Sequence, residues 1–452
     1  MNDLRIGYGC CIINGECGMG IEGYFVPRYV KGMIDDLTAQ AIYISLEGKD
    51  AVILSLDVIG IRKELTDKIS AKIEAELGVC KDSIFVSATH THTAPIISDS
   101  EMFPIDEEGM IKYRDVVCSG AVAAAKAAIA DAVSSKIAYG TAMAPDRIAY
   151  IRRYRMRDGS TMTCPPINDP DIMHPLGTLD QRVHVVRFDR EGKESVIILN
   201  YGLHADTIGG ELSSSDWCGW VRRTLDKALD GVKCLCIMGA QGDVGSTNVH
   251  PTASDMNDTE ISFDNEMKSP GMARFVGRAL AGAVLSVYDK LTYFEPSELK
   301  VAKKTLTVPS NMPAPEDMPR AREYKKLHEA GRDDLIPYSA MELTTVVAEA
   351  LRMCELENGP ESYDIELIGL SLGEVALVGI PGEPFTDIGV RIKESDTFPL
   401  VMPAALSNGY MGYFPDSAAF AEGGYESRSS KYRAGVAEAI IDTAKTLLKE
   451  IS

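Results

Sequence analysis

Apolar residues along this chain fall into two alternating patterns, short continuous runs and longer runs with helical spacing. Residues 41–58 hold two apolar runs around a Gly-Lys-Asp turn, a pattern that predicts a β-hairpin. Residues 63–78 follow with an apolar residue at every fourth position, which predicts an amphipathic helix that ends at Gly78. The apolar run at 83–90 then predicts a strand, so this part of the chain is a β-α-β unit.

The same alternation continues to the end of the chain and predicts an α/β fold with mixed β-sheets and flanking helices. Further strands are predicted at 182–188, 194–204, 232–239, 365–383 and 400–406, and helices at 270–290 and 431–450. The helix at 270–290 is expected to carry Phe275 on its apolar face. Residues 309–360 begin with several prolines and continue as charged, helical sequence, so we predict a helical insertion within a single domain over residues 1–452.

Polar residues cluster where the predicted strands end. Five segments share this pattern: SATHTHTAP at 87–95, NYGLHADT at 200–207, MGAQGDVGSTN at 238–248, IPGEPFTD at 380–387 and ALSNGYMGY at 405–413. They supply His90, His92, His204, Asp206, Asp243, Ser246, Glu383, Tyr410 and Tyr413. Because ligands of α/β proteins bind beyond the carboxyl ends of strands, the pattern predicts one site at one sheet edge.

His90 and His92 lie two positions apart, and in an extended strand such residues face the same side. Their imidazoles could bind one cation together, or one could bind a metal while the other moves protons, since histidine suits both tasks. The alternative is a chance pair of hydrogen-bonded polar residues at a strand end. The pair alone leaves these interpretations open.

His204 and Glu383 could complete a metal site, although each has a structural alternative. A lone histidine at a strand end is often structural, and Glu383 could be an acidic residue at a helix start, with Pro384 as the first helical residue. Taken together, two or three histidines and a carboxylate form a zinc-like set. Catalytic zinc usually has three protein ligands with N and O donors and an open position for water.

Composition limits the possible partners. The chain has 46 Lys and Arg against 66 Asp and Glu, a formal net charge of −20, which disfavours nucleic acid and anionic membranes. No segment is apolar over the length of a membrane span, and the start has no secretory signal pattern, so we expect a cytoplasmic protein. The ten cysteines are dilute and are expected to be reduced. A small-molecule substrate is the expected partner, and the oligomeric state is left open.

The motifs resemble those of one family. SATHTHTAP, LNYGLHADT, GDVGSTN, VGIPGEPFT and SNGYMGYFPDSAAFAEGGYE occur in this order, and they resemble the N-terminal catalytic domain of the neutral/alkaline, non-lysosomal ceramidase family. The resemblance extends from about residue 4 to 450. It implies a ceramidase-like catalytic α/β domain that cleaves an amide bond with Zn²⁺.

The resemblance also implies roles for individual residues. The implied zinc ligands are His90, His204, Glu383 and Tyr413. The implied catalytic residues are His92 at the reacting group, Tyr425 at the substrate oxyanion, and Arg152 in the same pocket, with Arg153 as the competing register. Ser246 corresponds to a family serine only if one residue is inserted, because without a gap Gly245 takes that position.

The chain departs from the family in ways that change the expected substrate. Ceramidases carry a C-terminal β-sandwich, for which we expect no room in this chain, and they are usually secreted or membrane-associated. We therefore predict a zinc-dependent hydrolase that cleaves an amide, ester or lactone bond of a small soluble substrate, without stable membrane association. The alternatives are a zinc-dependent lyase or isomerase on the same scaffold, or a non-catalytic homologue that binds metal or ligand.

Overall fold

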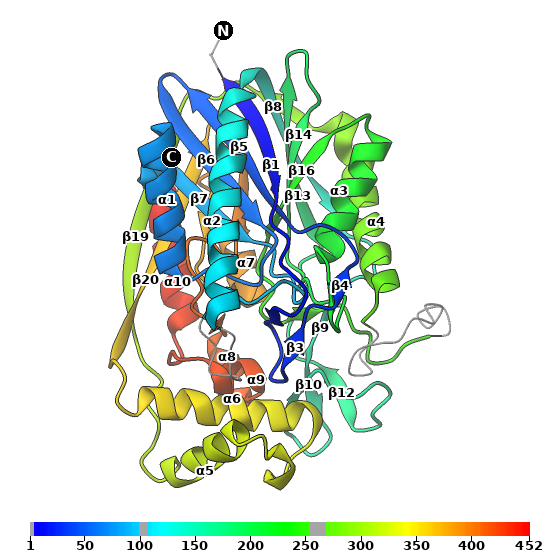
Figure 1. The fold of residues 1–452 in the computed structure, drawn as a ribbon, viewed down its shortest axis with the longest axis vertical. Coiled ribbons are helices and arrows are strands. Elements are labelled where there is room, and N and C mark those ends of the chain that lie inside the picture. The colour runs from blue at the N-terminus through cyan, green and yellow to red at the C-terminus, as the bar shows by residue number, and fades with distance from the viewer. Residues whose placement is uncertain (1–3, 99–106, 253–267) are drawn as a thin grey trace.

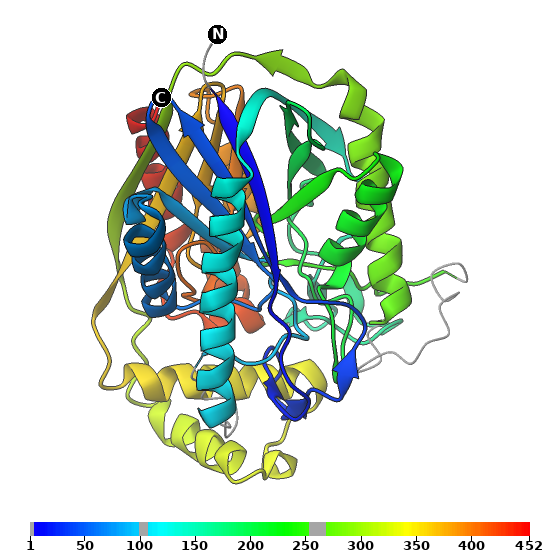
Figure 2. The same cartoon turned by 45° about the horizontal axis from the view of Figure 1, so that its top comes forward.

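Four layers make up the structure, with two β-sheets packed face to face and helices on both outer faces (Figures 1 and 2). A computed structural model describes residues 4–98, 107–252 and 268–452. This arrangement confirms the predicted α/β fold with mixed sheets and flanking helices.

The larger sheet has nine strands and is mixed. Its strands are β1 (Arg5–Ile12), β5 (Thr38–Leu46), β6 (Lys49–Leu56), β7 (Ile84–Ala88), β8 (Val133–Met143), β13 (Arg182–Arg190), β14 (Val196–Tyr201), β16 (Lys233–Met238) and β18 (Thr292–Phe294). Their order is β16-β14-β13-β8-β1-β5-β6-β7, and β18 pairs with β8. The β6–β7 and β14–β16 pairs are parallel, and the other pairs are antiparallel.

The second sheet has four strands, and all except its edge strand β19 are largely buried on both faces. These strands are β19 (Leu299–Pro309), β20 (Ser362–Leu372), β21 (Val375–Gly379) and β23 (Leu400–Ala404), in the order β19-β20-β21-β23. In β20, Ile368 and Leu370 pack toward the large sheet, whereas Ile365 and Leu367 pack toward the outer helices. Burial on both faces explains the continuous apolar run in the sequence.

Helices cover the outer faces of the two sheets and connect their strands. They are α1 (Lys63–Leu77), α2 (Glu107–Ala130), α3 (Asp216–Ala228), α4 (Pro270–Val287), α5 (Met318–Glu329), α6 (Ala340–Leu356), α7 (Thr386–Lys393), α8 (Ser417–Glu422), α9 (Tyr425–Ser429) and α10 (Val436–Glu450). The first four lie on the large sheet, and α7 and α10 lie on the second. Among the described helices, none combines the length and the apolar character needed to cross a membrane.

Short two- to four-residue strands pair the loops near one end of the sheets. They are β2 (Gly20–Ile21), β3 (Arg28–Tyr29), β4 (Gly32–Met33), β9 (Tyr150–Ile151), β10 (Arg153–Met156), β11 (Thr161–Thr163), β12 (Ile172–Pro175), β15 (Leu212–Ser213), β17 (Val244–Gly245), β22 (Glu383–Pro384) and β24 (Tyr413–Phe414). Among them, the β4–β15 and β9–β17 pairs join loops that are distant in the sequence.

The local predictions agree with the structure except at two points. Helix α1 is followed by Gly78 in the left-handed conformation with φ 78°, as predicted from its position. Helix α4 matches the predicted helix, but the side chain of Phe275 is 50% exposed, so its expected place on the buried face is wrong. The strand predicted at 83–90 ends at Ala88, which changes the account of the two histidines that follow.

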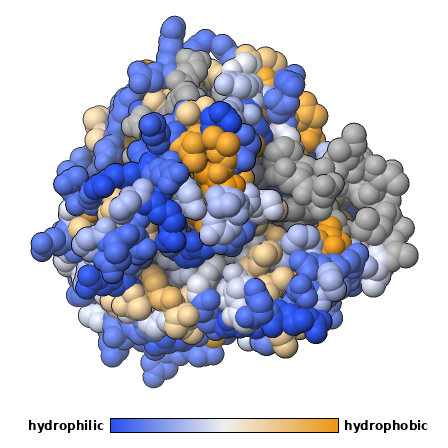
Figure 3. Space-filling view, turned by 90° about the horizontal axis from the view of Figure 1, so that it is seen from below, coloured by the Kyte–Doolittle hydropathy of each residue, from blue (hydrophilic) through white to orange (hydrophobic). Residues whose placement is uncertain are grey.

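Helices α5 and α6 lie between β19 and β20, in the segment expected to be a helical insertion. They form the lower end of the molecule in Figure 1, and the face seen from that end is largely hydrophilic, with a compact hydrophobic group near its middle (Figure 3). Helix α6 packs on α9, where Arg428 pairs with Glu342 at 2.8 Å and with Glu349 at 2.6 Å. The treatment of residues 309–360 as an insertion within one domain stays a prediction.

Two glycines in β1 allow helix α2 to pack directly on the sheet. A Cβ atom on Gly9 would lie 2.0 Å from the Ala124 carbonyl oxygen, and one on Gly7 would lie 1.8 Å from the Ala128 carbonyl oxygen. Both carbonyls belong to the backbone of α2, which cannot retreat without moving the whole helix. Glycine is therefore required for this close approach.

We expect Gly9→Ala to lower the free energy of unfolding by about 1–3 kcal/mol, because the added methyl group overpacks the contact between β1 and α2. The measurement is the denaturant midpoint. Gly282→Ala in α4 is the control, because its Cβ meets no atom within 4 Å and alanine favours helix. Unchanged stability of Gly9→Ala would contradict the close-packing account.

Candidate metal centre

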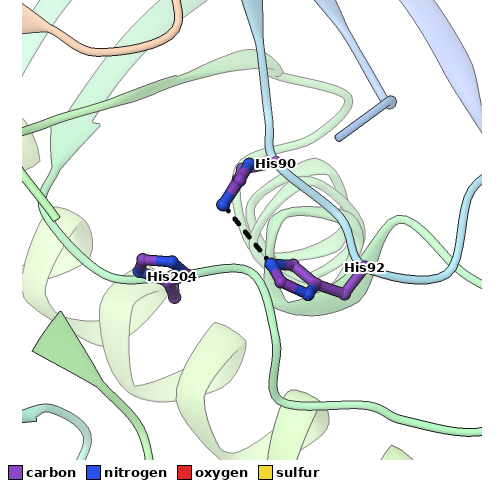
Figure 4. A group of neighbouring side chains, drawn as sticks. All are labelled: His90, His92 and His204. Atoms are coloured by element: carbon purple, nitrogen blue, oxygen red, sulfur yellow. Dashed lines mark hydrogen bonds between the residues drawn. The ribbon is translucent and has the colours of Figure 1, made fainter. Parts of the chain in front are cut away.

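Three buried histidines meet where the large sheet ends (Figure 4). His90 and His92 come from the segment after β7, and His204 comes from the segment after β14. Their rings lie close together, with centroids 4.8 Å apart for His90–His92 and 4.8 Å for His90–His204. One ligand atom from each lies within 4.8 Å of the others, a spacing that could hold a metal ion.

The two neighbouring histidines converge through a turn and not through an extended strand. His90 has φ 64°, which lies in the left-handed region. The prediction that an extended strand brings His90 and His92 to the same side is therefore wrong. Backbone hydrogen bonds fix this turn, since Thr89 N–H donates to the Leu56 carbonyl at 2.9 Å and His90 N–H donates to the Val58 carbonyl at 3.0 Å. The turn is therefore anchored to the strand end beside it.

Backbone carbonyls fix the protonation of two histidines. His90 Nδ1 lies 2.5 Å from the Ile59 carbonyl oxygen, and His204 Nδ1 lies 2.8 Å from the Gln241 carbonyl oxygen. Because a carbonyl can only accept, each Nδ1 carries the proton and a neutral ring presents a lone pair at Nε2. Burial and the Arg152 guanidinium lower the pKa of His204 to about 4, so its ring is neutral near pH 7.

Glu383 brings a carboxylate to the same point from the second sheet. It pairs with Tyr413 in the short parallel β22–β24 ladder, and Tyr410 donates to its Oε1 at 2.9 Å. Oε2 lies 3.3 Å from His90 Nε2 and 3.0 Å from His204 Nε2. Pro384 lies in β22 and α7 begins at Thr386, so the interpretation of Pro384 as the first helical residue is wrong.

The three converging atoms fit a metal ion. Glu383 Oε2 is buried and has no hydrogen-bond donor among the described residues, although two imidazole nitrogens lie beside it. His90 Nε2 also lies 3.3 Å from His92 Nε2, and although burial lowers the pKa of His90, the adjacent Glu383 carboxylate leaves it raised overall. A buried carboxylate oxygen beside two imidazole nitrogens is stable only with a proton or a cation next to it. A nitrogen and oxygen donor set with second-shell carbonyls is typical of a metal centre.

Arg152 lies in this centre, whereas Arg153 points away from it. Arg152 donates through Nε to Glu426 at 2.7 Å and through Nη2 to the Tyr413 hydroxyl at 3.1 Å, and its Nη1 lies 3.2 Å from His204 Nε2. Arg153 instead donates to Glu422 at 3.1 Å. Of the two competing arginines, Arg152 is therefore the one beside the candidate ligands His204 and Tyr413.

His92 differs from the other two histidines because its ring has no backbone carbonyl partner among the described residues; its Nε2 instead lies 3.3 Å from His90 Nε2 (Figure 4). Its Nδ1 is buried without a hydrogen bond to any described residue and lies 3.7 Å from Asp206 Oδ1. Burial lowers its pKa well below the ordinary value. Asp206 is held in turn by Lys268 Nζ at 2.8 Å and by the Tyr24 hydroxyl. Sequence patterns missed Lys268 and Tyr24, since neither follows a strand with the polar pattern of the other segments.

The remaining predicted residues border the centre. The ring of Tyr425 lies 5.6 Å from the ring of Tyr413, and Phe25 packs on its other side at 6.4 Å. Ser246 and Gly245 both line a small cavity next to His204, so the geometry does not choose between them. Glu426, which anchors Arg152, was missed although it directly follows Tyr425 in the sequence.

Solved structures share this arrangement of elements. The crystal structure of neutral ceramidase from Pseudomonas aeruginosa matches with a TM-score of 0.73 and 18% identity, over 100% of this chain and 75% of that chain. A structure described as ceramidase complexed with C2 matches with a TM-score of 0.72 and 18% identity, over 100% of this chain and 76% of that chain. The chain has a ceramidase-like fold.

This likeness confirms the predicted ceramidase resemblance at the level of the fold. At 18% identity it carries no activity or substrate across to this chain. No family model matches the chain, and no curated protein matches its sequence.

We expect His204→Ala and Glu383→Gln each to weaken metal binding by more than about 100-fold, because direct ligands should matter more than outer partners, whose loss costs about 10- to 100-fold. His92→Ala should change the affinity by less than about tenfold. Metal content and calorimetric titration of the purified variants measure both effects.

His184→Ala is the matched control, since His184 is a buried histidine in β13 outside this cluster. A metal loss in His92→Ala as large as that in His204→Ala would contradict the assignment. It would make His92 a ligand together with His90 and His204, and normal metal binding by Glu383→Gln would remove Glu383 from the set.

Proposed function

We propose that this chain is a metal-dependent hydrolase that cleaves an amide, ester or lactone bond of a small soluble substrate with a metal-activated water. The observation that carries the proposal is the buried convergence of His90 Nε2, His204 Nε2 and Glu383 Oε2. The ceramidase-like fold supports amide hydrolysis as the reaction class, by analogy. Tyr413 is the proposed fourth ligand, since its hydroxyl is held beside these atoms by Arg152.

Zn²⁺ is the proposed metal, because imidazole and carboxylate donors suit it and a catalytic site keeps an open position. When bound, such an ion lowers the pKa of a water molecule to near 7 and polarises a carbonyl group. These properties supply the nucleophile and part of the electrophilic activation.

The side chains around the ligands have separate proposed tasks. His92 is free of carbonyl anchoring, and we assign it the transfer of a proton to the leaving amine or alcohol. Arg152 is fixed by Glu426 and by the Gly242 carbonyl, to which Nη2 donates at 2.8 Å. A guanidinium held so firmly is ready to stabilise negative charge on a substrate oxygen, and we assign Tyr425 to the same oxygen.

Ser246 is retained as a proposed site residue because it borders the cavity beside His204. The cytoplasmic location and the lack of stable membrane association stay predictions from composition. A lyase or isomerase using the same ligands would release product without incorporating oxygen from water, and a non-catalytic homologue would bind metal without turnover.

Hydrolysis in ¹⁸O-labelled water tests the reaction class. With metal-loaded protein and a panel of N-acyl amides, esters and lactones, we expect one ¹⁸O atom in each carboxylate product, because water is the nucleophile. Mass spectrometry of the products gives the measurement. Turnover without label would favour the lyase or isomerase, and metal binding without turnover across the panel would favour the non-catalytic homologue.

We expect His92→Ala to keep the metal and lose about 10²- to 10⁴-fold in kcat, the usual contribution of a general acid or base. Steady-state kinetics together with metal analysis of the same preparation check this. His184→Ala serves again as a control for loss of a buried imidazole. A variant His92→Ala with normal kcat would remove the residue from the proton transfer.

A further inference from the structure

A small cavity adjoins the metal centre and has no counterpart in the mechanism described so far. It has a volume of about 30 Å³, and His204 and Arg152 form its wall toward the metal ligands. Tyr154 and Val249 also line it and are called the opposite wall below, and the ion-paired Lys268 and Asp206 are further lining residues. Because a candidate ligand lines it, a substituent of a substrate bound at the metal site could enter this cavity.

The cavity is small. A cavity needs a volume of roughly 10–15 Å³ to hold one water molecule. A cavity of about 30 Å³ therefore accommodates about two or three groups of that size. An acetyl group has three heavy atoms and matches that size. A long alkyl chain would need the opposite wall to move away.

The opposite wall is held by packing and by backbone hydrogen bonds. Tyr154 and Val249 are 6% and 4% exposed and pack together with Met156 in one apolar cluster. Tyr154 lies in the β10 strand, which pairs with β11 on one side and β12 on the other. The Val249 carbonyl accepts a hydrogen bond from Asn168 N–H at 2.8 Å. Retreat of this wall would break several of these contacts at once.

Charge along the side of the cavity also disfavours an alkyl chain. Lys268 Nζ lies 2.8 Å from Asp206 Oδ2, and the two side chains are only 6% and 16% exposed. A long apolar chain passing this pair would remove the remaining water from both charges without replacing its hydrogen bonds. A short acyl group ends before it covers the pair.

We propose that this cavity is the acyl subsite and that it selects substrates with an acyl group of acetyl size. The inference rests on the proposed metal-dependent hydrolysis and narrows its substrate class to short-chain N- or O-acyl compounds. Tyr154 and Val249 are the residues that set the length limit.

Acyl hydroxamates test the subsite by binding, independently of turnover, because they chelate a metal through two oxygens and carry an acyl chain of chosen length. Calorimetric titration of metal-loaded protein should give at least tenfold tighter binding of acetohydroxamate than of octanohydroxamate. Equal or tighter binding of octanohydroxamate would overturn the proposal, as would failure of metal-loaded protein to bind either compound.

A Val249→Ala variant tests the wall itself. Removal of two methyl groups should raise the affinity for butyrohydroxamate at least fivefold relative to acetohydroxamate, whereas Val232→Ala, an equally buried valine outside the cavity, should leave the ratio unchanged. Thermal unfolding confirms that each variant is folded. An unchanged ratio in folded Val249→Ala would overturn the assignment of the wall.

Metal binding and hydrolysis of long-chain amides distinguish a failure of the short-acyl subsite from a failure of the proposed function. Protein that binds no metal would end both proposals. Metal-loaded protein that hydrolyses long-chain amides with ¹⁸O incorporation would keep the hydrolase assignment and overturn the short-acyl subsite.

Discussion

Two imidazole nitrogens and a carboxylate oxygen meet in the interior of this protein, and the surrounding hydrogen bonds fix the direction of each side chain. Backbone carbonyls of Ile59 and Gln241 keep the protons of His90 and His204 on the far side of their rings. Tyr410 occupies one oxygen of Glu383 and leaves the other directed at the imidazoles. A proton or a cation offsets the burial of this carboxylate only if the sheet ends keep it beside the imidazoles.

The topology of the two sheets provides that fixation. The parallel pairs β6–β7, β14–β16 and β21–β23 all run toward the same end, so the segments after them meet there. The short β22–β24 and β9–β17 ladders then join these segments across large distances in sequence. Charged side chains such as Arg152 and Glu426 are anchored between these ladders and not on freely moving loops.

Apolar periodicity and the polar ends of strands were enough to predict the fold class and the meeting of His90, His204 and Glu383, because both depend on local patterns and on the direction of strands. The left-handed turn at His90 was not predictable, since it depends on hydrogen bonds to a neighbouring strand end. Lys268 was missed because its role comes entirely from tertiary contact with Asp206. The choice between Arg152 and Arg153 was likewise not predictable, because it depends on the sheet to which β10 belongs.

The proposed metal ligands are divided between the two sheets, because His90 and His204 follow strands of the larger sheet while Glu383 follows a strand of the smaller one. Neither sheet can form the site before the other has docked against it. Any ion that binds there acts on the docked state alone and stabilises it by mass action. Metal binding is thus thermodynamically linked to the docking of the two sheets, and an occupied site indicates that both sheets are docked.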